Sequence, residues 1–126
     1  MGTPEFSLQT LKTLCTSEFE IVCVYTQPPK KSDRGQKINK TPIHTFSEKL
    51  NLEVRTPADL LSEDEYQYFK KLNPYIAIVV AYGKIIPKKY LSVPKKGFLN
   101  IHASLLPKLR GAAPIQRSIM NSEKET

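Results

Sequence analysis

Two polar side chains stand two residues apart near the carboxyl end of a short predicted strand. Phe98–His102 follows Gly97 and precedes a polar turn, which is typical of a strand. Because side chains alternate along a strand, Asn100 and His102 are expected on the same face. An amide can donate a hydrogen bond, and an imidazole can donate one or carry a proton. The pair could therefore act on a substrate, or it could be two polar residues satisfied at a strand end.

The position of the pair in the chain favours a ligand site. Open parallel sheets bind their ligands at the carboxyl ends of the strands. Leu105 to Ala113 contains Pro107, Gly111 and two basic residues, which predicts an ordered loop next to the pair. Pro114 then suits the first turn of a helix over Ile115–Asn121.

The whole string from Asn100 to Gly111 resembles a family signature. Its pattern, Asn-x-His-x-Ser-Leu-Leu-Pro-x-x-x-Gly, is similar to that of the folate-dependent formyltransferases. The continuation RGAAPIQR (Arg110–Arg117) and the first residues, MGTPEF, resemble the branch of the family that acts on methionyl-tRNA. The resemblance implies transfer of a formyl group from 10-formyltetrahydrofolate to the amino group of initiator methionyl-tRNA, without a metal ion.

The resemblance also implies roles for individual residues. Formyl transfer passes through a tetrahedral intermediate whose oxyanion needs hydrogen-bond donors, and the attacking amine needs a base. Asn100 would supply one donor, and His102 would be a second donor when protonated or a proton carrier when neutral. A nucleophilic Ser or Cys is not required, because the substrate amine attacks. The tetrahydrofolate carrier would be bound by Ser104, Leu105, Leu106 and Pro107.

Positive charge is concentrated in two parts of the chain. The net charge is +7, and no Asp or Glu lies between Glu65 and Glu123, a span with ten Lys or Arg. Lys30–Lys40 reads as a long loop that carries a net charge of +4, where the family has an insertion associated with the tRNA acceptor end. A solvated basic surface is the alternative to nucleic-acid binding. The residues expected to contact tRNA phosphates are Lys30, Lys31, Arg34 and Lys37.

The predicted strands are apolar runs that suit the interior of a parallel sheet. Glu20–Thr26 and Ile76–Tyr82 are rich in β-branched residues, and Leu52–Thr56 predicts a shorter strand. Tyr82 and Gly83 end the neighbouring strand and could border the same cleft as Asn100.

Helix start signals lie between these strands. Thr3 is expected to cap a helix that begins at Pro4, Thr41 to cap another, and Ser62 to open a capping box with Glu65. The alternation of helix and strand predicts an α/β fold with a mainly parallel sheet flanked by helices. The resemblance implies the Rossmann-like formyltransferase fold.

Length and composition indicate one globular domain at most. The chain has 126 residues, 40% hydrophobic and 25% charged, without an apolar run of about 18 residues. Cys15 and Cys23 read as buried small hydrophobes, which favours a reducing compartment. We expect a cytoplasmic protein without a membrane partner, monomeric in its full-length form.

The family pattern implies segments outside this sequence. In the family, residues ahead of Gly-Thr-Pro form the first strand, a catalytic Asp lies beyond the position of Thr126, and a carboxyl-terminal nucleic-acid-binding domain follows. Residues 1–126 are therefore expected to be part of a catalytic domain, with a gap between Glu20–Thr26 and Ile76–Tyr82, and to be inactive alone. The alternatives are a formyltransferase acting on a small amine, such as a nucleotide or amino sugar, and a non-catalytic fragment.

Overall fold

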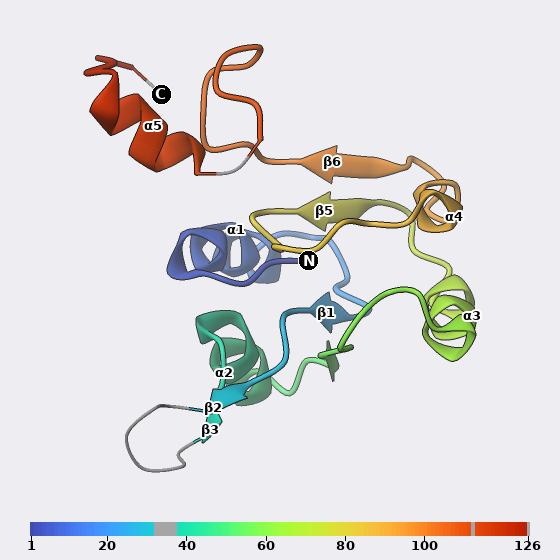
Figure 1. Cartoon of the computed structure of the whole chain (residues 1–126). Helices are drawn as coiled ribbons and strands as arrows, with labels where there is room; N and C mark the ends of the chain where they lie inside the picture. The colour runs from blue at the N-terminus through green and yellow to red at the C-terminus, as the bar shows by residue number, and fades with distance from the viewer. Residues whose placement is uncertain (32–37, 112, 126) are drawn as a thin grey trace.

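Helices and short parallel strands alternate along the chain, as the sequence predicted (Figure 1). The structure, a computed structural model, describes residues 1–31, 38–111 and 113–125. Strand β1 (Val24–Tyr25) pairs in parallel with β4 (Val54–Arg55), and β5 (Ala77–Val79) pairs in parallel with β6 (Phe98–Asn100). The fold is therefore α/β, with an incomplete parallel sheet.

The first two residues join the two parallel pairs. Gly2 N–H donates to the carbonyl of Tyr25 (2.9 Å), and Val80 N–H donates to the carbonyl of Met1 (2.9 Å). Gly2 also forms a parallel bridge with Val80. Met1 and Gly2 thus lie between β1 and β5, so that the order across the sheet is β6, β5, Met1–Gly2, β1, β4.

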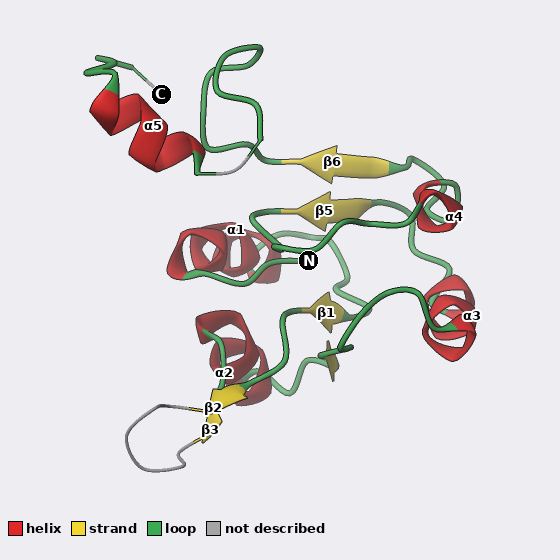
Figure 2. Ribbon diagram, viewed as in Figure 1, coloured by secondary structure: helices red, strands yellow, loops and turns green. Residues whose placement is uncertain are grey.

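Helices cover both faces of this sheet (Figure 2). Helix α1 (Glu5–Cys15) packs against α2 (Pro42–Lys49), and α3 (Glu63–Lys71) packs against α4 (Lys88–Leu91). Helix α5 (Pro114–Met120) follows the loop after β6. Among the described ranges, no helix has the length and apolar character needed to cross a bilayer.

Two buried clusters hold the layers together. Val24 joins Leu11 of α1 and Ile43 of α2, whereas the adjacent Tyr25 joins the cluster on the opposite face. Neighbouring residues of β1 thus enter different clusters because their side chains alternate. The second cluster comprises Tyr25, Leu60, Phe69, Ala77, Tyr82 and Tyr90.

The starts of two helices show which capping predictions were right. Thr41 caps α2 as predicted, its hydroxyl accepting from His44 N–H (3.1 Å). The prediction for Thr3 was wrong, because α1 begins at Glu5 after Pro4 and has no side-chain cap. The Thr3 hydroxyl instead donates to the carbonyl of Tyr82 (2.8 Å), a partner 79 residues away. That bond ties the start of α1 to the end of β5.

The basic segment predicted as a loop contains a hairpin. Strand β2 (Lys30–Lys31) pairs antiparallel with β3 (Ile38–Asn39). Residues 32–37 lie outside the described residues. The predicted strand Glu20–Thr26 is shorter in the structure. Only Val24–Tyr25 form a ladder, because their partner β4 consists of two residues, Val54–Arg55.

Candidate active site

The predicted catalytic pair lies at the carboxyl end of β6. Asn100 is the last residue of the strand, opposite Val79 of β5, and its side chain is exposed. Ile101 N–H donates to the carbonyl of Val79 (2.9 Å) and continues the pairing for one residue. His102 lies beyond the strand, so the alternation argument does not fix its direction. Its half-buried side chain is held by the loop instead.

The loop holds His102 through Ser104. The Nδ1 atom of His102 lies 2.8 Å from Ser104 Oγ, which donates to the carbonyl of Lys108 (2.9 Å). Lys108 N–H donates back to the carbonyl of Leu105 (3.0 Å), closing a tight turn. Ser104 is only 9% exposed, so this contact is protected from water.

The apolar residues of the same loop face solvent. Leu105 is 55% exposed and Leu106 is 58% exposed, and Pro107 is also exposed. Exposed leucines beside a polar pair form an apolar surface suited to a ring system. Of the four predicted folate-binding residues, only Ser104 turns inward toward His102.

The carboxyl ends of the other strands are tied together beside β6. Gln27, which follows β1, donates from Nε2 to the carbonyls of Tyr82 and Gly83 (3.2 Å each). Gly83 has φ +77°, and a Cβ there would lie 2.3 Å from Gln27 Nε2. A side chain at this position would be strained and would displace Gln27. Gln27 is not among the residues predicted for this site, although its place directly after a buried strand was a usable signal.

Tyr82 contributes its backbone to this edge, and its ring is buried in the core. The side chain is 1% exposed, and burial raises the pKa of Tyr82 to about 12. The phenol therefore stays neutral at physiological pH.

Two of the four predicted tRNA-contacting residues, Lys30 and Lys31, lie among the described residues, on β2. The side chain of Lys30 is exposed on β2, Lys31 pairs with Ile38 through its backbone, and Arg34 and Lys37 lie outside the described residues. The hairpin and the loop after β6 leave the carboxyl edge on the same side, at opposite ends of the row of strands (Figure 1).

The base of the hairpin is anchored to α2. Lys40 Nζ lies 2.5 Å from Glu48 Oε1, and His44 Nε2 lies 3.3 Å from the same oxygen. The hydrogen bond from Lys40 lowers the pKa of the Glu48 carboxyl. An ionised Glu48 thus holds two basic side chains next to β3.

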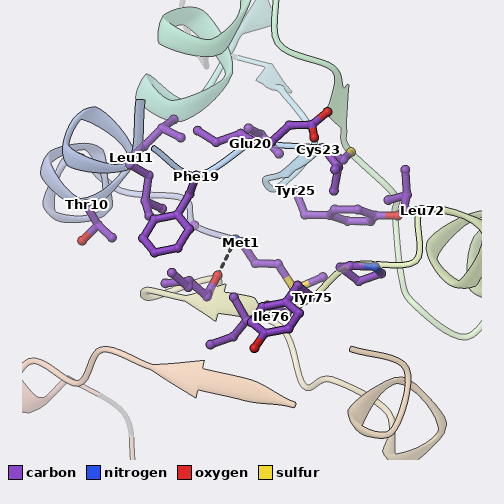
Figure 3. Close-up of a pocket in the computed structure, with 18 of the residues that line it drawn as sticks. Met1, Thr10, Leu11, Phe19, Glu20, Cys23, Tyr25, Leu72, Tyr75 and Ile76 are labelled. Carbon is purple, nitrogen blue, oxygen red and sulfur yellow. Dashed lines mark hydrogen bonds between the residues drawn. The ribbon is translucent and has the colours of Figure 1, made fainter. Parts of the chain in front are cut away.

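A cavity lies within the described part of the chain, and neither Asn100 nor His102 lines it. It has a volume of about 700 Å³ and lies between the segment leading into β1 and the start of β5 (Figure 3). Met1, Phe19, Tyr75 and Ile76 are among the residues that line it. Among the described residues, no group of three or more potential metal-ligating side chains was found.

The amino group of Met1 is buried beside this cavity. The α-ammonium of Met1 donates to the carbonyl of Ile78 (2.7 Å), which continues the parallel pairing toward the cavity (Figure 3). Burial lowers the pKa of this amino group to about 6. This contact lies at the amino edge of the strands, whereas the candidate residues Asn100 and His102 lie at the carboxyl edge.

Comparison with known proteins agrees with the signature. Residues 1–126 match the formyl transferase family. A methionyl-tRNA formyltransferase of Pelagibacter ubique (strain HTCC1062) is 62% identical over 127 residues, covering 100% of this chain and 41% of that protein. One of Parvibaculum lavamentivorans is 49% identical, covering 100% of this chain and 41% of that protein, and one of Wolbachia sp. subsp. Drosophila simulans is 48% identical, covering 100% and 42%. The chain thus spans about two fifths of the length of these relatives.

Proposed function

The chain belongs to the formyl transferase family, and from this premise we propose that it is part of an enzyme that formylates methionyl-tRNA. The formyl donor would be 10-formyltetrahydrofolate, and the acceptor would be the amino group of methionine on the initiator tRNA. The observation that carries the proposal is the end of β6, where Asn100 is exposed and His102 is held by Ser104 beside an apolar loop. The enzyme would work in the cytoplasm, where charged tRNA is used.

The reaction exchanges one bond to the formyl carbon for another. The methionyl amine attacks that carbon, and a tetrahedral intermediate forms. The bond from the carbon to N10 of the folate then breaks, while one proton leaves the amine and one reaches N10. Charge therefore develops on the formyl oxygen and on the amine.

Asn100 would donate a hydrogen bond to the oxyanion that develops on the formyl oxygen. Its amide is a neutral donor at the end of a paired strand, so its backbone is fixed by β5. A donor aimed at an oxyanion stabilises the transition state more than the substrate, typically by about 2.7–4 kcal/mol.

His102 would carry the proton that leaves the amine. A neutral imidazole accepts the amine proton, and the resulting cation can return it to the leaving nitrogen. The contact of Nδ1 with Ser104 leaves the other ring nitrogen for the substrate. Leu105, Leu106 and Pro107 would offer an apolar surface to the folate ring, and the polar atoms of Ser104 would remain occupied within the loop.

The test is an acceptor assay with an enzyme of the relatives' length that carries these residues. We expect formylation of charged initiator tRNA in the presence of 10-formyltetrahydrofolate. We expect Asn100→Ala and His102→Ala each to lower kcat by about 10²–10³, whereas the control Asn121→Ala, at the exposed residue that follows α5, should not. Formylation of glycinamide ribonucleotide or a sugar nucleotide, without any of Met-tRNA, would show that the acceptor is a small amine.

The basic hairpin has a separate test. Replacing Lys30, Lys31, Arg34 and Lys37 by Ala should weaken tRNA binding and flatten its salt dependence, by about 0.9 in the log–log slope for each lost phosphate contact. Folate binding should not change. The matched control removes the same charge from exposed lysines at the other edge of the sheet, namely Lys70, Lys71, Lys95 and Lys96. Equal losses in the two variants would leave only a general electrostatic effect.

A further inference from the structure

The two contacts of Ser104 determine the direction of its hydroxyl hydrogen. Ser104 Oγ lies 2.9 Å from the carbonyl oxygen of Lys108 and 2.8 Å from His102 Nδ1. A carbonyl oxygen can only accept, and a serine hydroxyl has one hydrogen. The hydrogen therefore points to Lys108, and a lone pair of the oxygen faces Nδ1. The contact with His102 is a hydrogen bond only if Nδ1 carries the hydrogen.

We propose that Ser104 is a positioning residue that fixes His102 as the Nδ1–H tautomer and so leaves the Nε2 lone pair for the substrate amine. The catalytic meaning rests on the function proposed above, whereas the tautomer follows from the contacts of this chain alone. Which nitrogen carries the proton decides which one can act as a base.

The surrounding turn makes this arrangement rigid. The Lys108 carbonyl is fixed because the turn from Leu105 is closed by a backbone hydrogen bond of 3.0 Å. Ser104 itself is 9% exposed, so its hydroxyl has little access to water. Rotation of the hydroxyl toward Nδ1 would break its hydrogen bond to the Lys108 carbonyl.

The hydrogen bond between Nδ1 and Ser104 can persist while Nε2 takes up and releases a proton. When Nε2 takes a proton from the amine, Nδ1 keeps its own and continues to donate to Ser104. Nothing in the loop has to reorganise, and the dipole of the Lys108 carbonyl lies behind the new positive charge. The tautomer thus favours His102 as a proton carrier that starts neutral over a donor that starts protonated.

The tautomer can be measured directly on this chain. Two-bond ¹H–¹⁵N spectra distinguish a bare ring nitrogen from one that carries hydrogen, and at about pH 8 a histidine with the usual pKa is neutral. We expect a bare Nε2 and a protonated Nδ1 for His102 in the unmodified chain. A bare Nδ1 would overturn the proposal without any variant.

Variants then test the part played by Ser104. Ser104→Ala should shift His102 toward the Nε2–H tautomer, and Ser104→Thr, which keeps the hydroxyl, should restore Nδ1–H. The control is Ser92→Ala, which removes another serine-to-carbonyl contact that involves no histidine. An unchanged tautomer in Ser104→Ala would show that another group fixes the ring.

Kinetics in an enzyme of the relatives' length separate this role from folate binding. We expect Ser104→Ala to lower kcat about tenfold with little change in KM for the folate, and Ser104→Thr to recover most of the rate. A rise in KM alone would assign Ser104 to the folate site and overturn the positioning role. A different acceptor would refute the proposed function and leave the tautomer result in place.

Discussion

Glu65 is a carboxylate whose surroundings matter more than its place in a motif. Its sequence context predicts a capping box, and Ser62 Oγ accepts from Glu65 N–H at 3.5 Å. The carboxylate itself turns into the core, where it accepts from the Tyr25 hydroxyl (2.8 Å) and pairs with Arg55 (2.5 Å). Burial and this carboxylate together raise the pKa of Tyr25. Glu65 therefore ties α3 to β1 and β4.

Removing this carboxylate should destabilise the chain. Glu65→Ala leaves the buried hydroxyl of Tyr25 without an acceptor, which typically costs about 1–3 kcal/mol. Arg55 is 36% exposed, so water can replace its partner. Urea unfolding should show the loss, whereas Glu63→Ala, which removes an exposed carboxylate of the same helix, should have no measurable effect. Equal midpoints for the two variants would refute the role of Glu65.

The two cysteines should differ in reactivity. Burial raises the pKa of the Cys23 thiol to about 12, and only the thiolate reacts readily with alkylating agents. At about pH 8, iodoacetamide should modify the Cys15→Ser variant, in which Cys23 remains, at least tenfold more slowly than the Cys23→Ser variant. Similar rates would mean that the cavity beside Cys23 admits water and reagent.

Among the elements, α2 is the clearest case of a helix specified by its first residues. Thr41 accepts from His44 N–H and also contacts Thr26 Oγ1 at 2.7 Å, so that one side chain caps the helix and joins it to the end of β1. Thr41→Ala should lower the stability by about 1 kcal/mol. Thr45→Ala, an exposed position inside the same helix, should be neutral, because alanine is the better helix former. Thermal melts of both variants compare the two effects, and equal losses would contradict the capping role.

Helix starts were predicted correctly where the capping residue and its partner lie within one turn of each other. Thr41-Pro42 and the residues from Ser62 to Glu65 gave the right helix starts, because a cap needs only residues within one turn. The parallel α/β class also followed from alternation along the chain.

Features that depend on distant partners could not be predicted from local patterns. Strand β1 is shorter than its apolar run because pairing depends on Met1–Gly2 and β4. The hydroxyl of Thr3 bonds to the carbonyl of Tyr82 and does not cap α1. His102 lies outside β6 because the backbone pairing with β5 ends at Ile101. For the candidate site, the motif supplied the residue types, while the contact that orients His102 came only from the structure.

At the scale of the whole molecule, the buried amino terminus should make stability depend on pH. The pKa of the Met1 amino group is about 6 in the folded chain, against 8.0 for its ordinary value. Between these values the unfolded chain binds more protons, so stability should rise as the pH increases from 6 to 8. The upper limit is about 3 kcal/mol, because one pKa unit corresponds to about 1.4 kcal/mol.

Acetylation of the amino terminus provides the control. An acetylated Met1 can still donate to the Ile78 carbonyl but has no proton to titrate. Its melting temperature should therefore change much less between pH 6 and pH 8 than that of the free amine. The same pH dependence in both forms would show that the Met1 amino group does not cause it.

The isolated chain should not turn over substrate. Glu123, the carboxylate next along the chain from the candidate site, lies 3.7 Å from Lys108 Nζ rather than at His102. The formyltransferase resemblance implies a catalytic Asp that is not among residues 1–126. Catalytic groups that act as a unit lose most of their rate when one is missing. Turnover by the purified chain, measured against an enzyme of the relatives' length at equal concentration, tests this. Comparable rates would show that these residues suffice.

The bond between Met1 and Ile78 spans 77 residues, which has a consequence for synthesis of the chain on the ribosome. Translation at roughly 5–20 residues per second separates these two residues by roughly 4–15 s. During that interval Met1 and Gly2 can contact β1 but not β5, although α1 and α2 can already form. The centre of the sheet is therefore expected to close late, after β5 has emerged, so Met1 and Gly2 should stay exposed to solvent in nascent chains stalled before Ile78.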